Sequence, residues 1–398
     1  MESNPIRIET RTTPAAPPVL TVDALVDATP ASRDRYVDLL RALSIAVVVL
    51  WHWVFSITQW SRHDALTMPN PIDSLPGAWL TTWVLQIMPV FFLVGGYANL
   101  AGWESSERKG GGSQAFLAGR LRRLARPVGI YVGCWAVADL ALRLAWGADA
   151  SVLRWGMVVF VPLWFLGVYV GVIVLAPLTI AAHRRFGLLV PVTLGGAILA
   201  SDRLRFEHGV GAAGVATSVL VWLFVHQLGY FWRDGSLAAT GRRGATLLAA
   251  GGLATLVTLT AVGPYPRSMV STSDSEISNM YPTTAPIAAL AAFQLGLVLL
   301  AAPAMRRWLE RRRVWRVVVS VNAVAMTIFC WHMTALIGAI AVFEAAGGRL
   351  GTEADTGWWL QRPLWLAAPG VLLAGLVAVF ARFELPGRPV RTPRSRMT

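Results

Sequence analysis

Long apolar runs are the feature that most constrains this chain. Stretches such as ALSIAVVVLWHWVF, GVYVGVIVLAPLTIAA and GVLLAGLVAVFA carry almost no charge. A soluble domain cannot bury so much apolar surface, and the mean hydropathy of +0.54 over 398 residues agrees with this. Helices of about 20 residues cross about 30 Å of hydrocarbon. The chain is therefore predicted to be an all-α polytopic membrane protein.

Polar segments divide these runs into about ten predicted transmembrane helices. They are expected near 36–56, 78–100, 128–146, 155–181, 188–200, 211–231, 245–262, 284–302, 317–343 and 364–381. The run that starts at Leu188 is short for a span. Residues 36–382 form the predicted transmembrane domain, with a Pro-rich cytoplasmic tail at 1–35, expected to be disordered, and a basic cytoplasmic tail at 383–398.

Basic residues indicate the orientation, because Lys and Arg close to span ends stay on the cytoplasmic side. With both termini cytoplasmic, the connections on that side and the C-terminal tail together hold 22 Lys and Arg, against 7 in the connections on the other side. The connection 103–127 is among the most basic. This alternation requires the short fifth span. It also explains the net charge of +13 without a nucleic-acid partner. No cleavable signal peptide is predicted, and the expected location is the inner or plasma membrane.

Two ionisable residues share one face of the first predicted helix. Arg41 and His52 are eleven positions apart, about three turns, or about 16 Å along the axis. Ionisable groups at membrane depth are costly and usually functional. A neutral imidazole there can take a proton from an attacking hydroxyl, while a guanidinium suits a phosphate. Alternatively, His52 belongs with Trp51 and Trp53 to an interfacial aromatic belt.

Other polar residues in the spans have plainer interpretations. His226 and His332 are predicted to pack through hydrogen bonds, and Asp139 with Arg143 forms an intrahelical ion pair. Neither a metal site nor a disulfide framework is predicted from the two cysteines. The chain also lacks Walker, dinucleotide-binding, zinc-protease and serine-hydrolase motifs.

An ordered set of motifs resembles the integral-membrane acyltransferase-3 family. The set begins with Arg41 and His52 in YVDLLRALSIAVVVLWHWVF and continues with MPVFFLVGGYANL, where Gly95 replaces the Ser of the family's Ser-Gly pair. The basic motif RLRRLARP, the segment PLWFLGVYV and the late helix segment IFCWHM follow in order. They supply Arg120, Arg123 and Arg126, then Trp164, Phe165 and Leu166, and finally His332.

This resemblance implies a membrane-embedded, acyl-CoA-dependent O-acyltransferase. An acyl group, usually acetyl, would pass to a hydroxyl of a glycan, a cell-envelope component or a secondary metabolite. His52 would be catalytic, and Arg41, Arg120, Arg123 and Arg126 would face the donor, with Trp164 and His332 as supporting residues. Acyl-CoA would be a co-substrate, with no bound cofactor, and a separate extracytoplasmic relay protein is a further expected partner.

Two alternatives stay open. A secondary transporter or exporter would also have many helices and intramembrane charges, although the two halves of this chain show no convincing repeat. A non-catalytic scaffold would need neither Arg41 nor His52. Within the enzyme interpretation, residue identity does not decide whether His52 is a general base or is itself acylated.

Overall fold

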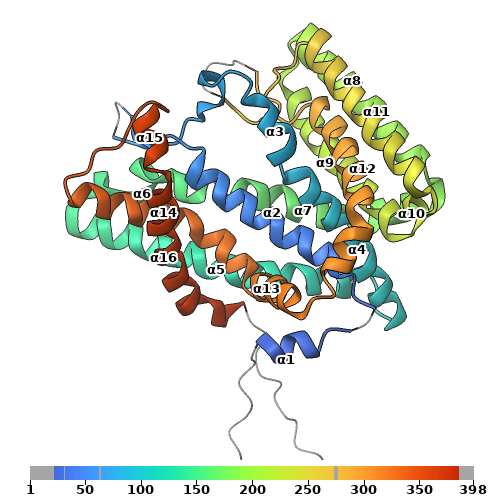
Figure 1. Cartoon of the computed structure of the whole chain (residues 1–398), viewed down its shortest axis with the longest axis horizontal. Helices are drawn as coiled ribbons and strands as arrows, with labels where there is room; N and C mark the ends of the chain where they lie inside the picture. The colour runs from blue at the N-terminus through green and yellow to red at the C-terminus, as the bar shows by residue number, and fades with distance from the viewer. Residues whose placement is uncertain (1–21, 31, 62–63, 273–276, 385–398) are drawn as a thin grey trace, which may run out of the picture.

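The computed structural model describes residues 22–30, 32–61, 64–272 and 277–384, and nearly all of its regular structure is helical (Figure 1). The elements are α1 Val22–Asp27, α2 Arg35–Val54, β1 Gln59–Trp60, β2 Leu66–Thr67, η1 Pro71–Ser74, α3 Trp79–Leu85, α4 Met88–Arg108, α5 Ser113–Trp146, η2 Ala148–Ala150, α6 Val152–Trp155, η3 Met157–Phe160, α7 Leu163–Phe186, α8 Leu189–His208, α9 Gly211–Arg233, α10 Ser236–Ala239, α11 Gly241–Val262, α12 Ala285–Trp308, α13 Arg312–Ala323, α14 Ala325–Ala345, α15 Thr356–Leu360, α16 Arg362–Phe380 and η4 Ala381–Phe383. The strands β1 and β2 pair as a short antiparallel hairpin. The predicted all-α class is confirmed.

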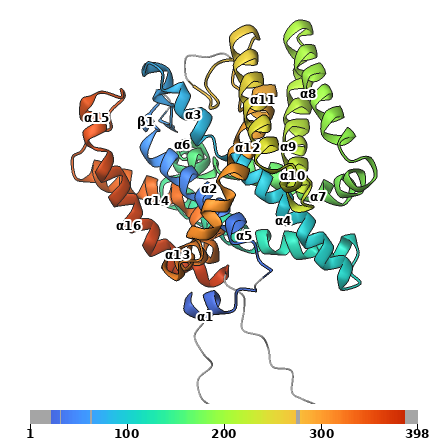
Figure 2. The same ribbon diagram turned by 45° about the vertical axis from the view of Figure 1, so that its right-hand side comes forward.

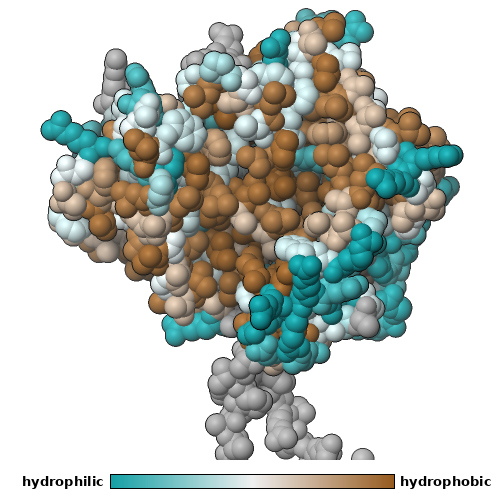
Figure 3. Space-filling view, in the orientation of Figure 1, coloured by the Kyte–Doolittle hydropathy of each residue, from teal (hydrophilic) through white to brown (hydrophobic). Residues whose placement is uncertain are grey.

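Nine helical segments of the described chain are long and apolar enough to cross a membrane. They are Arg35–Val54, Trp79–Arg108, Ser113–Trp146, Met157–Phe186, Gly211–Arg233, Gly241–Val262, Ala285–Trp308, Ala325–Ala345 and Arg362–Phe383. Figure 3 shows apolar surface across the middle of the molecule and hydrophilic surface at the end that carries α1 and α13. This pattern is that of a multi-pass membrane protein.

The fifth predicted span, 188–200, is not among these nine, although it is helical. α8 has 20 residues, about 30 Å at 1.5 Å per residue. Its last turns are too polar for an apolar span because they hold Asp202, Arg203, Arg205, Glu207 and His208. α8 nevertheless crosses the bundle: it begins where α7 ends, and at the opposite end Asp202 accepts hydrogen bonds from the Tyr265 hydroxyl and the Ala285 amide, both 2.9 Å.

The helices pack as two groups around a shared middle. α8 lies along α9, α9 along α4, and α11 along α12, while α14 lies along α16 and contacts α2 and α5. Figure 2 separates the α8–α12 group from α14, α15 and α16. Glycines allow the closest approach: a Cβ at Gly96 would lie 2.1 Å from the His226 carbonyl oxygen. Helices in lipid associate through small residues of this kind, which brings α4 and α9 into backbone contact.

The predicted helix 317–343 is wrong as a single helix. It divides at Val324 into α13 and α14. Hydrogen bonds of a polar side chain accompany the break. The Asn322 side chain donates to the carbonyl oxygens of Val318 and Asp38, both at 2.9 Å. α13 is amphipathic, with four arginines in or beside its first turns, and lies at one end of the bundle (Figure 1).

The predicted connection 103–127 is also largely wrong. α4 continues to Arg108, and α5 begins at Ser113 and runs through Pro127. Leu, Ala and Arg dominate this stretch and are strong helix formers, and arginine side chains reach the interface from a helix as readily as from a loop. The basic motif therefore lies on the first turns of a 34-residue helix.

The first 35 residues include structure that a disordered tail would not have. α1 packs against α13, where Arg312 contacts Asp27 at 2.6 Å and Arg316 contacts Asp23 at 3.2 Å. At the other described end, Glu384 accepts hydrogen bonds from the amides of Met326 and Thr327 at the start of α14. Both ends of the described chain thus lie at one end of the bundle, as an even number of crossings requires. Residues 1–21 and 385–398, parts of the two predicted tails, lie outside the described residues.

Candidate active site

His52 and His332 form a hydrogen-bonded pair between α2 and α14. The Nδ1 atom of His52 lies 3.0 Å from Nε2 of His332, and the two rings stack with centroids 5.2 Å apart and planes at 23°. Trp53 Nε1 donates to the His332 carbonyl oxygen at 3.2 Å, which ties α2 to the same turn of α14. Residues 280 positions apart in sequence therefore meet inside the bundle.

One backbone contact settles the proton positions in this pair. His332 Nδ1 lies 2.7 Å from the Phe329 carbonyl oxygen, which can only accept, so Nδ1 carries the proton. In the neutral ring Nε2 of His332 is then an acceptor, and His52 must donate through Nδ1. The lone pair of His52 consequently resides on Nε2, which has no hydrogen-bond partner among the described residues. This nitrogen is available for chemistry.

The two histidines differ in accessibility. His332 is fully buried, whereas His52 keeps accessible surface although protein surrounds it. Aromatic rings adjoin the pair: Phe329 lies 6.1 Å from His332 and 5.6 Å from Phe165, centroid to centroid. An apolar, sheltered setting keeps imidazoles neutral, as a base or nucleophile requires. His226 lies apart from the pair, buried and hydrogen-bonded to Asn99 at 3.0 Å, as predicted for a packing residue.

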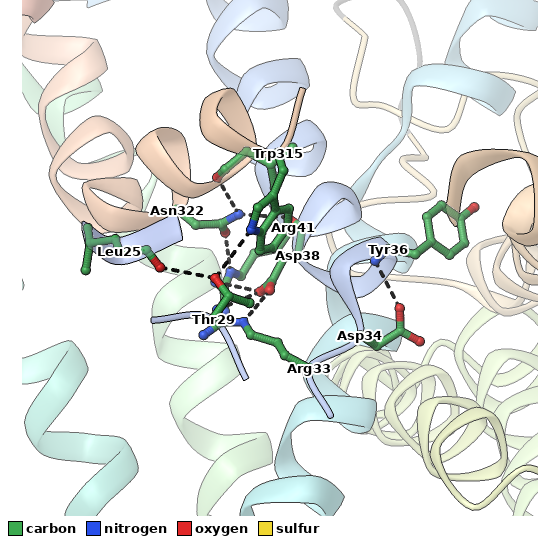
Figure 4. A network of polar contacts seen from close by, with 10 residues as sticks. Leu25, Thr29, Arg33, Asp34, Tyr36, Asp38, Arg41, Trp315 and Asn322 are labelled. Atoms are coloured by element: carbon green, nitrogen blue, oxygen red, sulfur yellow. Dashed lines mark hydrogen bonds and ion pairs between the residues drawn. The ribbon is translucent and has the colours of Figure 1, made fainter. Parts of the chain in front are cut away.

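Arg41 lies in a polar network at the α1–α13 end of α2 (Figure 4). Its Nε donates to Asn322 Oδ1 at 2.6 Å, and its Nη2 lies 3.1 Å from Asp38 Oδ1. Arg33 binds the same carboxylate. The Arg41 side chain still exposes 35% of its surface, and its Nη1 has no hydrogen-bond partner among the described residues, so the guanidinium can take a further anion.

Arg120 and Tyr169 lie near Arg41. Arg120 donates to the Ala98 carbonyl oxygen and lies over the Phe116 ring at 5.8 Å. Arg41 and Arg120 both interact electrostatically with Tyr169. A Cβ at Gly95 would lie 2.9 Å from Cε2 and 3.5 Å from the hydroxyl of Tyr169. The tyrosine thus occupies the space beside the position where a serine hydroxyl would stand if Gly95 were serine.

The remaining predicted site residues are more exposed. Arg123 and Arg126 project from α5 and make no hydrogen bond or ion pair within the described chain. Trp164 is 38% exposed and makes an edge-to-face contact with Phe165. Phe165, rather than Trp164, connects α7 to the ring cluster beside His332. The predicted ion pair of Asp139 with Arg143 is confirmed at 2.7 Å.

A comparison with protein families identifies the family of this chain. The chain matches the acyltransferase-3 family, described as an acyltransferase domain, over residues 34–382. The chain belongs to the acyltransferase-3 family. The protein is therefore a membrane acyltransferase, and the transporter interpretation is disfavoured. No curated protein and no solved structure matches the chain.

Three residues that contact or lie near the candidate site were not among the predicted site residues. Asn322 accepts a hydrogen bond from Arg41, Tyr169 interacts electrostatically with Arg41 and Arg120, and Phe165 packs against Phe329 beside the histidine pair. The family-like segment PLWFLGVYV contains both Phe165 and Tyr169, so the sequence held a signal for these two residues and none for Asn322. Asn322 and Tyr169 act through contacts between segments far apart in sequence, and no spacing rule predicts those contacts.

Proposed function

We propose that this acyltransferase moves an acyl group, with acetyl as the first candidate, from acyl-CoA to a hydroxyl of a glycan, a cell-envelope component or a secondary metabolite. One observation carries the proposal: His332 holds Nδ1 of His52, which leaves the accessible His52 with a free lone pair on Nε2. A base in this state can accept a proton directly from a bound hydroxyl.

The cationic end of the site supports an acyl-CoA donor. Arg41 and Arg120 lie near one another, and Arg123 and Arg126 continue the positive surface along α5. The donor's phosphates would bind these guanidinium groups, since charge-assisted hydrogen bonds to phosphate are among the strongest in proteins. Arg41 precedes His52 by about 16 Å on α2, so a donor held by its phosphates can extend toward the imidazole.

The proposed step is direct transfer. The acceptor hydroxyl gives its proton to Nε2 of His52 while its oxygen attacks the thioester carbonyl carbon. The new C–O bond forms, the C–S bond breaks, and the proton passes from His52 to the departing thiolate. The products are the O-acyl ester and free coenzyme A. Acyl-CoA is consumed as a co-substrate, and no bound cofactor takes part.

The proposed orientation puts both termini and the arginine-rich end in the cytoplasm. Of the described basic residues, Arg306, Arg312 and Arg316 gather at that end with Arg41. Lys and Arg retained there would anchor the chain in the inner or plasma membrane and face the cytoplasmic pool of acyl-CoA.

The test is release of free coenzyme A from acetyl-CoA by purified protein, with a crude extract of polar metabolites as the source of acceptor. Wild-type protein should release coenzyme A only when the extract is present, and His52→Ala should not. His208→Ala is the matched control, because His208 lies exposed at the end of α8. Folded wild-type protein that neither transfers from nor binds any short-chain acyl-CoA would refute the proposal.

A further inference from the structure

Arg362 is the one buried arginine in the described part of the chain, with 9% of its surface exposed. It stands at the start of α16, and no carboxylate of the described residues lies within 4 Å of it. Buried Asp38, in contrast, has two arginine partners. A buried charge without a counter-charge is costly, so Arg362 requires an explanation.

Tryptophans hold the Arg362 side chain in place. Its guanidinium carbon lies 3.6 Å from the centre of the Trp358 ring and 6.0 Å from that of Trp365. Its Nε donates to the Trp358 carbonyl oxygen at 3.0 Å. The two terminal nitrogens, which carry four N–H groups, make no hydrogen bond within the described residues. The stacked guanidinium is therefore rigid and still has its terminal donors free.

Those donors adjoin a small, mostly polar cavity. Its lining includes Ser56 and Thr58 after α2, Gln361 beside α16, and Trp53. Ser56 lies one helical turn beyond His52, and Leu336 of the same lining lies one turn beyond His332. The cavity thus lies about one helical turn from the histidine pair, on the side opposite to Arg41.

We propose that Arg362 binds a carboxylate carried by the acceptor, which enters the site from the end opposite to the donor. A carboxylate presents two coplanar oxygens that match the guanidinium fork. An acceptor held there presents its neighbouring hydroxyls toward His52. This inference rests on the proposed acyl transfer and specifies the acceptor as a hydroxylated acid, such as a uronic acid residue of a glycan.

The experiment measures ligand-dependent thermal unfolding of the full chain in detergent, without any acyl donor. Sodium glucuronate is the probe and glucose its neutral counterpart, with sodium chloride matching the ionic strength and glucose 6-phosphate as a phosphate probe. The variants are Arg362→Gln, Arg362→Lys and the control Arg349→Gln, which removes an exposed arginine from the connection between α14 and α15.

Glucuronate should raise the unfolding temperature of wild type and Arg349→Gln in a saturable way, and glucose should not. Arg362→Gln should weaken the apparent affinity for glucuronate by at least about tenfold. Arg362→Lys keeps the positive charge, so its affinity should lie between those of wild type and Arg362→Gln, and it serves as the test variant if Arg362→Gln does not fold. Equal responses of Arg362→Gln and wild type, equal stabilisation by glucose, stabilisation by the phosphate probe alone, or no wild-type response to glucuronate would each overturn the proposal.

The two proposals fail in different ways. If glucuronate binds through Arg362 but acetyl-CoA is neither bound nor consumed, the acid site stands and acyl-CoA-dependent transfer is refuted. If coenzyme A release depends on His52 but glucuronate does not bind, the transfer reaction stands and the Arg362 site is refuted.

Discussion

His332 accepts a hydrogen bond from His52 across 3.0 Å, and that single contact determines which nitrogen of His52 is basic. His332 is therefore a positioning residue in the proposed reaction. An analogous arrangement, in which a second group orients a catalytic imidazole, occurs in many hydrolases.

The first prediction concerns this contact. His332→Leu should lower kcat by about 10²- to 10⁴-fold, the usual contribution of a well-placed base, and leave the KM for acetyl-CoA nearly unchanged. His332→Gln should recover part of the loss because its amide oxygen can accept from Nδ1 of His52. Steady-state kinetics of both variants provide the measurement. Equal losses in Leu and Gln variants would indicate that His332 only fills space.

Arg41 should contribute to donor binding. Arg41→Gln should raise the KM for acetyl-CoA about 10- to 100-fold, because hydrogen bonds to charged groups contribute about 1.5–3 kcal/mol. Arg143→Gln is the control, since Arg143 pairs with Asp139 on the α5 surface. If Arg41→Gln lowers thermal stability but leaves KM unchanged, Arg41 serves only to join α2 to Asn322.

The Gly95 position should be incompatible with serine. Since a Cβ there would lie 2.9 Å from the Tyr169 ring, Gly95→Ser should destabilise the protein by about 1–3 kcal/mol. The double variant Gly95→Ser with Tyr169→Leu should regain most of that stability. Thermal unfolding in detergent measures both effects. Gly171→Ser is the control, because a Cβ at Gly171 meets nothing within 4 Å; equal behaviour of the two glycines would contradict the clash.

The docking of α1 should depend on pH. The Arg312 guanidinium, hydrogen-bonded to Asp27, lowers the pKa of that carboxyl. Its stabilising effect is present above the ordinary aspartate pKa of about 4 and is lost as the pH falls through the lowered value. Amide hydrogen exchange of residues 22–30, corrected for intrinsic rates, should therefore accelerate in acid.

The control for this prediction is Asp27→Asn, which removes the titrating group. In that variant the exchange of α1 should lose most of its dependence on pH. An unchanged pH dependence would show that Asp27 does not hold α1 on α13, and would direct attention to Asp23 as the second acidic residue of α1.

Apolar periodicity predicts this fold well, because each span is a local property of its own 20 residues. It fails where polar contacts decide the structure, as at Asn322, whose bonds to α2 accompany the break between α13 and α14. For the site, spacing places Arg41 and His52 on one face, and their partners Asn322 and His332 are indeed close in sequence. The pairing across 280 residues is a tertiary contact, and no pattern within one helix contains it.

Arg41 and His52 lie on one uninterrupted helix, which fixes the distance between them. An α-helix hardly changes its length, so the spacing between Arg41, the proposed phosphate-binding group, and His52, the proposed base, stays constant whatever the surrounding helices do. Donors would be selected by the length of the arm that joins phosphate to thioester, more than by the acyl group at its tip. One residue inserted between Arg41 and His52 would turn His52 by about 100° away from His332 and change the distance between the two side chains.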